Sequence, residues 1–203
     1  MTLRLQCWLF AIGAALFATG TAPGFASVFG AGATNVVCFV GSWFFTSAAL
    51  IQLRLSVDGM DRLAARVQFI GTVLFNVSTA TAVWAHRVPA ERRFMWTPDA
   101  LGSVLFLLSS AISVAALLIW ARGTATLLRD WCPAWINMAG SVAFGVSAVG
   151  AFVRRTGVTA DEWLANVGTF VGALCFMVAA LMALPLRPSG HHPPHRTDRS
   201  ALG

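Results

Sequence analysis

The sequence contains no lysine and no tyrosine, and only 11% of its residues are charged. A soluble domain carries about 25% charged residues, because polar surface has to cover its core. Here 57% of the residues are hydrophobic, and the mean hydropathy is +0.72. Water is therefore excluded as the solvent for most of this chain, and the composition predicts a membrane protein.

Because lysine is absent, all 14 basic residues are arginines, and the formal net charge is +6. They lie between apolar runs, where arginines face anionic lipid headgroups and set the topology. The sequence has no basic patch interleaved with aromatic residues, which nucleic-acid binding would require. We therefore expect membrane lipids as partners, and no nucleic acid.

The sequence also lacks the motifs that would name a reaction. It has no glycine-rich phosphate loop, nucleophile elbow, HExxH motif or pair of catalytic carboxylates. Its four cysteines (Cys7, Cys38, Cys132 and Cys175) show neither CxxC nor metal-ligand spacing, although a structural disulfide stays open as an alternative. These absences predict a protein that is not an enzyme, with no catalytic residue, no metal and no cofactor.

What the sequence does contain is six uncharged apolar runs, each long enough to cross a hydrocarbon core of about 30 Å. The expected helices are residues 7–25, 33–53, 67–84, 99–120, 133–153 and 163–186. A tail rich in Pro, His and Arg, residues 187–203, is expected to be disordered and cytoplasmic. The predicted fold is all-α, a polytopic bundle of six transmembrane helices.

Each run carries the same three-residue pattern: a glycine, a phenylalanine four residues later, and a small residue three beyond that. The glycines, called here the stripe glycines, are Gly13, Gly41, Gly71, Gly102, Gly140 and Gly172. Offsets of four and seven residues fall on one face of an α-helix. Small residues let helices approach closely in lipid, so these stripes are predicted to be the packing faces of the bundle.

The stripes further indicate a helical hairpin used three times, because alternate helices resemble each other. Residues 70–78 read IGTVLFNVS, and residues 139–147 read AGSVAFGVS. Such repeats are expected to be related by an axis near the membrane normal.

The chain resembles the YrhK-like family of small membrane proteins. The residues that carry the resemblance are Gly41-Ser-Trp-Phe-Phe45, Gln68-Phe-Ile-Gly71-Thr-Val-Leu-Phe75-Asn76, Trp96-Thr-Pro-Asp99-Ala-Leu-Gly102-Ser and Asn137-Met-Ala-Gly140-Ser-Val-Ala-Phe144. They span most of the membrane region and leave out the tail. The resemblance implies a membrane domain built on a helix pair; the family has no assigned activity, so it implies no catalytic residue.

The first apolar run could also be a signal peptide, with Gly24-Phe-Ala26 as the cleavage site. We interpret it as a transmembrane helix, because a discarded peptide has no reason to carry the packing stripe. With the N-terminus inside, nine arginines fall on the inner side and five on the outer side. This bias favours a multi-pass protein of the cytoplasmic membrane with both termini in the cytoplasm.

Local signals also predict where three of the helices begin. Thr97-Pro-Asp99 has the N-cap, Pro and acidic residue of a helix start, Pro133 is expected to open the next helix, and Thr159-Ala-Asp-Glu162 has the form of a capping box. Asp99 is thus interpreted as a residue at a helix end. No charged residue lies deep in any of the predicted transmembrane helices.

Polar side chains near the stripes are the candidate site residues. Gln68, Asp99 and Asn137 each lie three residues before a stripe glycine, and Asn35 and Asn166 lie six before. Buried polar groups in lipid are costly unless paired, so these side chains should point inward. Asn76 lies near the middle of its span and is the candidate for contact with a polar solute or hydrated ion. In the tail, His191, His192 and His195 lack the fixed partners that a metal site needs.

Two functions remain after these exclusions. The first is a structural or interaction role, in which the stripes assemble the bundle, a homo-oligomer or a complex with another membrane protein. The alternative is a small-solute transporter or channel with an intramembrane polar site at Asn76, Gln68, Asn137, Asn35 and Asn166.

Overall fold

The computed structural model describes residues 2–57, 59–84, 91–120, 127–154 and 156–185, without the side chains of 91, 92, 120 and 127–130. Its helices are α1 (Leu3–Thr21), α2 (Phe25–Phe29), α3 (Ala31–Leu55), α4 (Gly59–Trp84), the π-helix η1 (Glu91–Trp96), α6 (Thr97–Trp120), α7 (Leu127–Gly150) and α8 (Glu162–Met182). Six helices are long and apolar enough to cross a membrane. The predicted all-α bundle of six helices is confirmed, and the chain is a multi-pass membrane protein.

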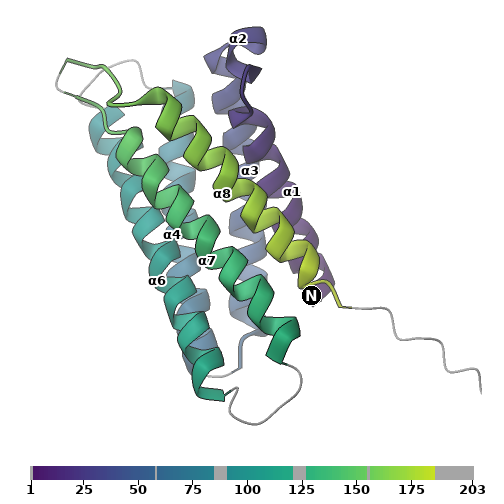
Figure 1. Cartoon of the computed structure of the whole chain (residues 1–203). Helices are drawn as coiled ribbons and strands as arrows, with labels where there is room; N and C mark the ends of the chain where they lie inside the picture. The colour runs from purple at the N-terminus through teal and green to yellow at the C-terminus, as the bar shows by residue number, and fades with distance from the viewer. Residues whose placement is uncertain (1, 58, 85–90, 121–126, 155, 186–203) are drawn as a thin grey trace, which may run out of the picture.

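The six long helices form a closed ring in the order α1, α3, α4, α6, α7, α8 and back to α1. Consecutive helices run in opposite directions, as the ribbon shows (Figure 1). Each helix packs mainly against its two neighbours in this ring. The first apolar run is one of the six members, so α1 completes the ring.

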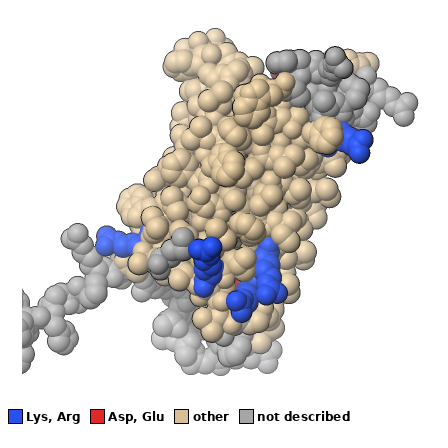
Figure 2. Space-filling view, turned by 180° about the vertical axis from the view of Figure 1, so that it is seen from behind, with Lys and Arg blue, Asp and Glu red and all other residues tan. Residues whose placement is uncertain are grey.

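The two ends of the bundle differ in charge. The end that holds the start of α1 and the connection from α3 to α4 exposes Arg4, Arg54, Arg62 and Arg66, and we call it the basic end. Figure 2 shows most of the blue side chains gathered at this lower end. The opposite end, called the far end, holds α2 and residues 151–154 and 156–161 (Figure 1).

Within each hairpin, the two stripes make a reciprocal contact. A methyl group added at Gly13 would lie 2.7 Å from the ring of Phe45, and one added at Gly41 would lie 3.1 Å from the ring of Phe17. The added methyl at Gly13 would also lie only 2.9 Å from the carbonyl oxygen of Gly41, so the two backbones are in contact. Glycine is required here because any side chain would separate the helices.

The same exchange occurs in the other two hairpins. Gly71 faces Phe106 while Gly102 faces Phe75, and Gly140 faces Phe176 while Gly172 faces Phe144. The six stripe phenylalanines meet on the bundle axis with Ala14, Ala18 and Ala173 in one buried cluster. The predicted packing stripes therefore form the core of a single chain.

Three helix starts differ from those predicted by local signals. Helix α4 begins at Gly59, so the segment of residues 59–66 that was expected to be a loop is helical. Helix α7 begins at Leu127 and contains Pro133 in its interior. The N-cap of α8 is Asp161, whose carboxylate accepts a hydrogen bond from the backbone N–H of Leu164 at 2.9 Å. Thr159 instead forms an isolated bridge with Val153.

Helix α6 begins at Thr97, as the local signals predict, but a π-helix that they do not predict precedes it. The π-helix η1 runs directly into α6 at Thr97, so Asp99 lies inside a continuous helical segment. Pro98 has no N–H, and its ring would collide with the carbonyl of Phe94 in a regular α-helix. The wider π-turn before it removes this conflict. Asp99 lies in the first turn of α6, within the stretch Arg93–Ile119 that is long and apolar enough to cross a membrane.

Candidate functional site

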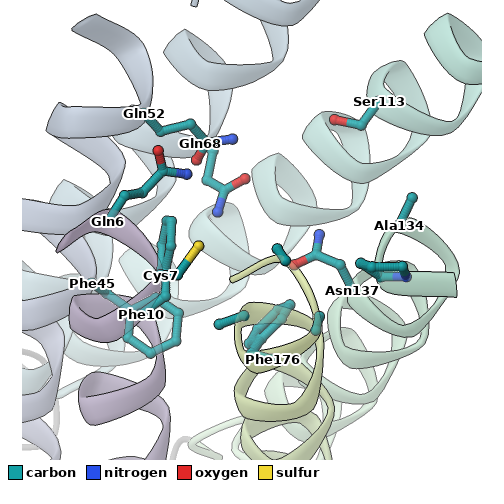
Figure 3. A pocket seen from close by; sticks show the side chains of 14 residues that line it. Gln6, Cys7, Phe10, Phe45, Gln52, Gln68, Ser113, Ala134, Asn137 and Phe176 are labelled. Carbon is teal, nitrogen blue, oxygen red and sulfur yellow. The ribbon is translucent and has the colours of Figure 1, made fainter. Parts of the chain in front are cut away.

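A partly open cavity of about 200 Å³ lies between the helix ends at the basic end of the bundle. Five uncharged polar side chains from five helices line it: Gln6, Gln52, Gln68, Ser113 and Asn137. Figure 3 shows Gln6, Gln52 and Gln68 grouped on one side of the cavity and Asn137 across from them. None of the described lining residues is charged.

A closed set of hydrogen bonds holds Asn137 in place. Its Nδ2 donates to the Ser110 hydroxyl at 2.9 Å, Ser110 lies 2.8 Å from the Ser141 hydroxyl, and Ser141 donates to the Asn137 carbonyl at 3.0 Å. Because Ser141 donates to that carbonyl, Ser110 is the donor in the serine pair. This order gives each hydroxyl one bond to donate and one to accept, and it joins α6 to α7 across a boundary between hairpins.

Removing the Ser110 hydroxyl should loosen this boundary. In the Ser110→Ala variant the Asn137 amide loses its acceptor, and we expect a loss of about 1–2 kcal/mol in the free energy of unfolding. Unfolding by SDS in mixed micelles measures it. The exposed Ser47 of α3 provides the control, since Ser47→Ala removes a hydroxyl outside this set of bonds. Equal stabilities of the two variants would contradict the assigned network.

On the other side of the cavity, the amides are less completely paired. The Ser109 hydroxyl lies 2.9 Å from the Ala64 carbonyl and 3.2 Å from Oε1 of Gln68, so it can donate to either. Oε1 of Gln52 is buried and has no hydrogen-bond partner. A buried acceptor without a donor costs about 1–3 kcal/mol. This oxygen is therefore a buried acceptor that no donor within the described residues satisfies.

The phenylalanine cluster closes the cavity on the axis. Phe45 and Phe176 line the cavity, and their rings lie 5.9 Å apart in an edge-to-face arrangement. Beyond them, a void of about 10 Å³ among Phe17, Phe75 and neighbouring rings is close to the smallest space that holds one water. The axis therefore consists of a polar cavity that ends at an apolar barrier.

The structure brings together two of the predicted site residues, Gln68 and Asn137, in this cavity. Asn76 lies outside its lining, and its Oδ1 is buried without a partner. The other two predicted residues lie at the far end: Nδ2 of Asn35 donates to the Ala82 carbonyl at 2.8 Å, and Asn166 lines a separate cavity of about 260 Å³. The predicted set is thus divided between the two halves of the bundle.

Three lining residues were missed by the sequence analysis, although a signal for them exists. Gln52 and Ser113 each lie 11 residues after a stripe glycine, which is three helical turns along the same face. Gln6 lies seven residues before Gly13, or two turns. Extending the stripes by these turns would have placed all three on the bundle axis.

The described residues contain no group of three or more His, Cys, Asp or Glu side chains that could hold a metal. The tail histidines lie outside the described residues. The resemblance to the YrhK-like family stays a prediction. The chain was compared with protein-family models, curated proteins and solved structures, and none of them matches it.

Proposed function

We propose that the protein binds a small, uncharged polar solute in the cavity at the basic end and carries it across the membrane. The observation that supports this most is the convergence of five uncharged polar side chains from five helices, among which the Gln52 Oε1 is buried without a donor. Polar groups inside a membrane bundle are costly, and they mark solute pathways when they line a cavity. The sequence favoured Asn76 as the polar site, whereas we propose that the site is this cavity.

The dimensions and chemistry of the cavity narrow the class of solute. Its 200 Å³ is below the 300–1,000 Å³ or so typical of sites for drug-sized ligands. Amide groups both donate and accept, and the described lining has no charge to balance an ion. A compact solute with several N–H or O–H donors is therefore the best fit.

Solute flux tests this proposal directly. Proteoliposomes containing the chain should take up urea, acetamide or glycerol faster than empty liposomes, as measured by stopped-flow light scattering. In the double variant Gln68→Leu/Asn137→Leu, two amides are replaced by apolar groups of similar size, and the flux should fall to the level of empty liposomes.

The control introduces a leucine on the lipid-facing side of the same helix instead. Val142 lies on α7 with Asn137 and is exposed, so Val142→Leu should leave the flux unchanged. Flux of all three solutes at the empty-liposome rate would refute transport of this solute class.

We propose in addition that the basic end, and with it the cavity, faces the cytoplasm. Four exposed arginines at this end support that orientation, because positive loops are retained inside. Arg154 is exposed at the far end. In a variant without native cysteines, Arg154→Cys should react with an impermeant thiol reagent in intact cells and Arg62→Cys should not; the opposite result would reverse the orientation.

A structural role is the second candidate, and the reciprocal glycine–phenylalanine contacts favour it. All six stripes are used inside one chain, where they form the core. If the bundle is only a scaffold, a homo-oligomer or another membrane protein would have to bind through the outer, lipid-facing surfaces rather than the stripes. The flux measurement separates this role from transport.

A further inference from the structure

The three hairpins share a symmetry that relates the two halves of the bundle. Each hairpin consists of two antiparallel helices that make two equivalent glycine–phenylalanine contacts, for example Gly13–Phe45 and Gly41–Phe17. If the two helices change places, the first contact takes the position of the second. Such an exchange is a two-fold rotation about an axis perpendicular to the bundle. It maps the basic half onto the far half, which is the arrangement of inverted repeats.

Polar contacts follow the same rotation. In the basic half, Gln68 of α4 lies three residues before Gly71, and Ser109 of α6 lies seven residues after Gly102. The Ser109 hydroxyl is 3.2 Å from Oε1 of Gln68. In the far half, Thr169 and Ser147 hold these same two positions, and their hydroxyls lie 2.6 Å apart. The helix that contributes each position is exchanged between the two cases. The two-fold relation therefore holds for hydrogen bonds as well as for the core.

Exchanging the two helices within each hairpin pairs residues that line the cavity with residues of the far half. The counterpart of Gln68 is Asp99, that of Asn137 is Thr169, and that of Gln6 is Thr34. The hydroxyl of Thr34 is buried and has no hydrogen-bond partner, as is the case for the Gln52 amide oxygen in the cavity. The far half thus carries the polar residues of a cavity, including a carboxylate within the membrane.

One position distinguishes the boundaries between hairpins in the two halves. Six residues before the stripe glycine, the helices α1, α4 and α7 carry Cys7, Ala65 and Ala134. These side chains are small and offer no strong hydrogen-bond donor. At this position of the basic end, these side chains therefore form no hydrogen bond that joins one hairpin to the next.

The corresponding residues of α3, α6 and α8 are Asn35, Trp96 and Asn166. Asn35 and Trp96 donate to the next hairpin, whereas Asn166 lines the far-end cavity of about 260 Å³. Asn35 Nδ2 reaches the Ala82 carbonyl of α4 at 2.8 Å, and Trp96 Nε1 reaches the Ala148 carbonyl of α7 at 2.9 Å. The Trp96 ring also packs edge-on against Phe152, with 4.9 Å between centroids. We call these two interactions the latches, because each joins two hairpins at the far end.

We propose that the far half contains a second solute-binding cavity, lined by Asp99, Thr169 and Thr34, which the latches keep closed in this state. Opening it closes the cavity at the basic end, so that the bundle exposes one site at a time on either side of the phenylalanine cluster. The inference rests on the proposed transport function. The acceptors in both halves suit the same class of solute, one with several N–H or O–H donors.

Two native thiols report on the two halves. Cys7 lines the open cavity, and Cys38 lies three residues before Gly41, at the position equivalent to Asp99. Two proteins would be made with Cys132 and Cys175 replaced by serine, one retaining only Cys7 and the other only Cys38. In nanodiscs both ends are accessible, and the labelling rate of each thiol by a small hydrophilic methanethiosulfonate reagent provides the reference value.

Removing the latches should shift these two labelling rates in opposite directions. Loss of one hydrogen bond between membrane helices shifts an equilibrium by about threefold to tenfold. Asn35→Ala and Trp96→Phe should each raise the labelling rate of Cys38 by about that factor and lower the rate of Cys7, and the double variant should show the larger change. Trp96→Phe retains a ring against Phe152, so it tests the N–H with little loss of packing.

The control is Thr81→Val, which removes a hydroxyl bonded only to its own helix at the Val77 carbonyl, 2.8 Å away. It should change neither rate. An unchanged Cys38 rate in the latch variants, or faster labelling of both thiols together, would overturn the proposal. Because labelling requires no solute, this result is independent of the flux measurement: exchange of accessibility without flux would refute transport and leave the second cavity standing.

Discussion

Replacing Gly172 by alanine is expected to destabilise the bundle although alanine is the better helix former. The added methyl would overlap the Phe144 ring and lie 2.9 Å from the Gly140 carbonyl oxygen. The ring cannot move aside, because it packs against four other stripe phenylalanines. Overpacking costs about 1–3 kcal/mol, and alanine recovers roughly 1 kcal/mol at most. SDS unfolding in mixed micelles measures the net loss.

Gly32 provides the matched control for this substitution. It lies in α3, and a methyl group added there would meet nothing within 4 Å. Gly32→Ala should therefore leave the free energy of unfolding unchanged or raise it slightly. A Gly172→Ala variant as stable as Gly32→Ala would show that α7 and α8 can separate without loss, and the close hairpin contact would be refuted.

The Phe144→Ala variant is expected to show the largest loss of stability. Phe144 is 4% exposed, and its ring lies 5.3 Å from that of Phe176 and 5.6 Å from that of Phe75. Truncating a buried phenylalanine costs about 3–5 kcal/mol, because packing is lost and a cavity is left. The same variant shortens the apolar barrier that closes the axial cavity. Thermal unfolding measures the first effect, and water permeability of proteoliposomes measures the second.

Phe29 in α2 is 64% exposed and outside the cluster, so Phe29→Ala should alter neither quantity. If Phe144→Ala destabilises the protein without raising water permeability, the remaining rings suffice as a barrier. If it does not destabilise the protein, the cluster does not hold the bundle together.

The sequence predicted the fold because the lipid environment reduces the choices available to the chain. Backbone groups in hydrocarbon must bond within their own segment, so each long apolar run has to be a helix. The recurring glycine and phenylalanine then identified the face of each helix that packs. Gly71 and Phe75, for example, were assigned to the same inward face from their spacing alone, and both are buried.

Helix starts were predicted less well, because local capping signals compete with tertiary packing. Thr97-Pro-Asp99 has the composition of a helix start, but the preceding residues continue the helix as a π-turn. Pro133 similarly lies inside α7. At both sites helical backbone extends to the N-terminal side of the residue at which local preferences place the helix start.

The candidate site was only partly accessible to sequence reasoning. Gln68 and Asn137 were identified by their distance from the stripe glycines, and both line the cavity. Asn35 satisfied the same rule but forms a latch at the far end. Spacing places a side chain on a face, and it does not distinguish a cavity from a seam between helices.

By itself, the sequence determined that this chain crosses a membrane with six helices and which face of each helix turns inward, since both follow from hydrophobicity and helical periodicity. Only the tertiary structure decided how the stripes pair, which polar side chains line a cavity and which polar groups are left unpaired. The physical reason is that the six stripes are nearly alike in sequence. Their difference arises from single residues, such as Ala65 in one half and Trp96 in the other, whose effect depends on the carbonyl groups across the boundary.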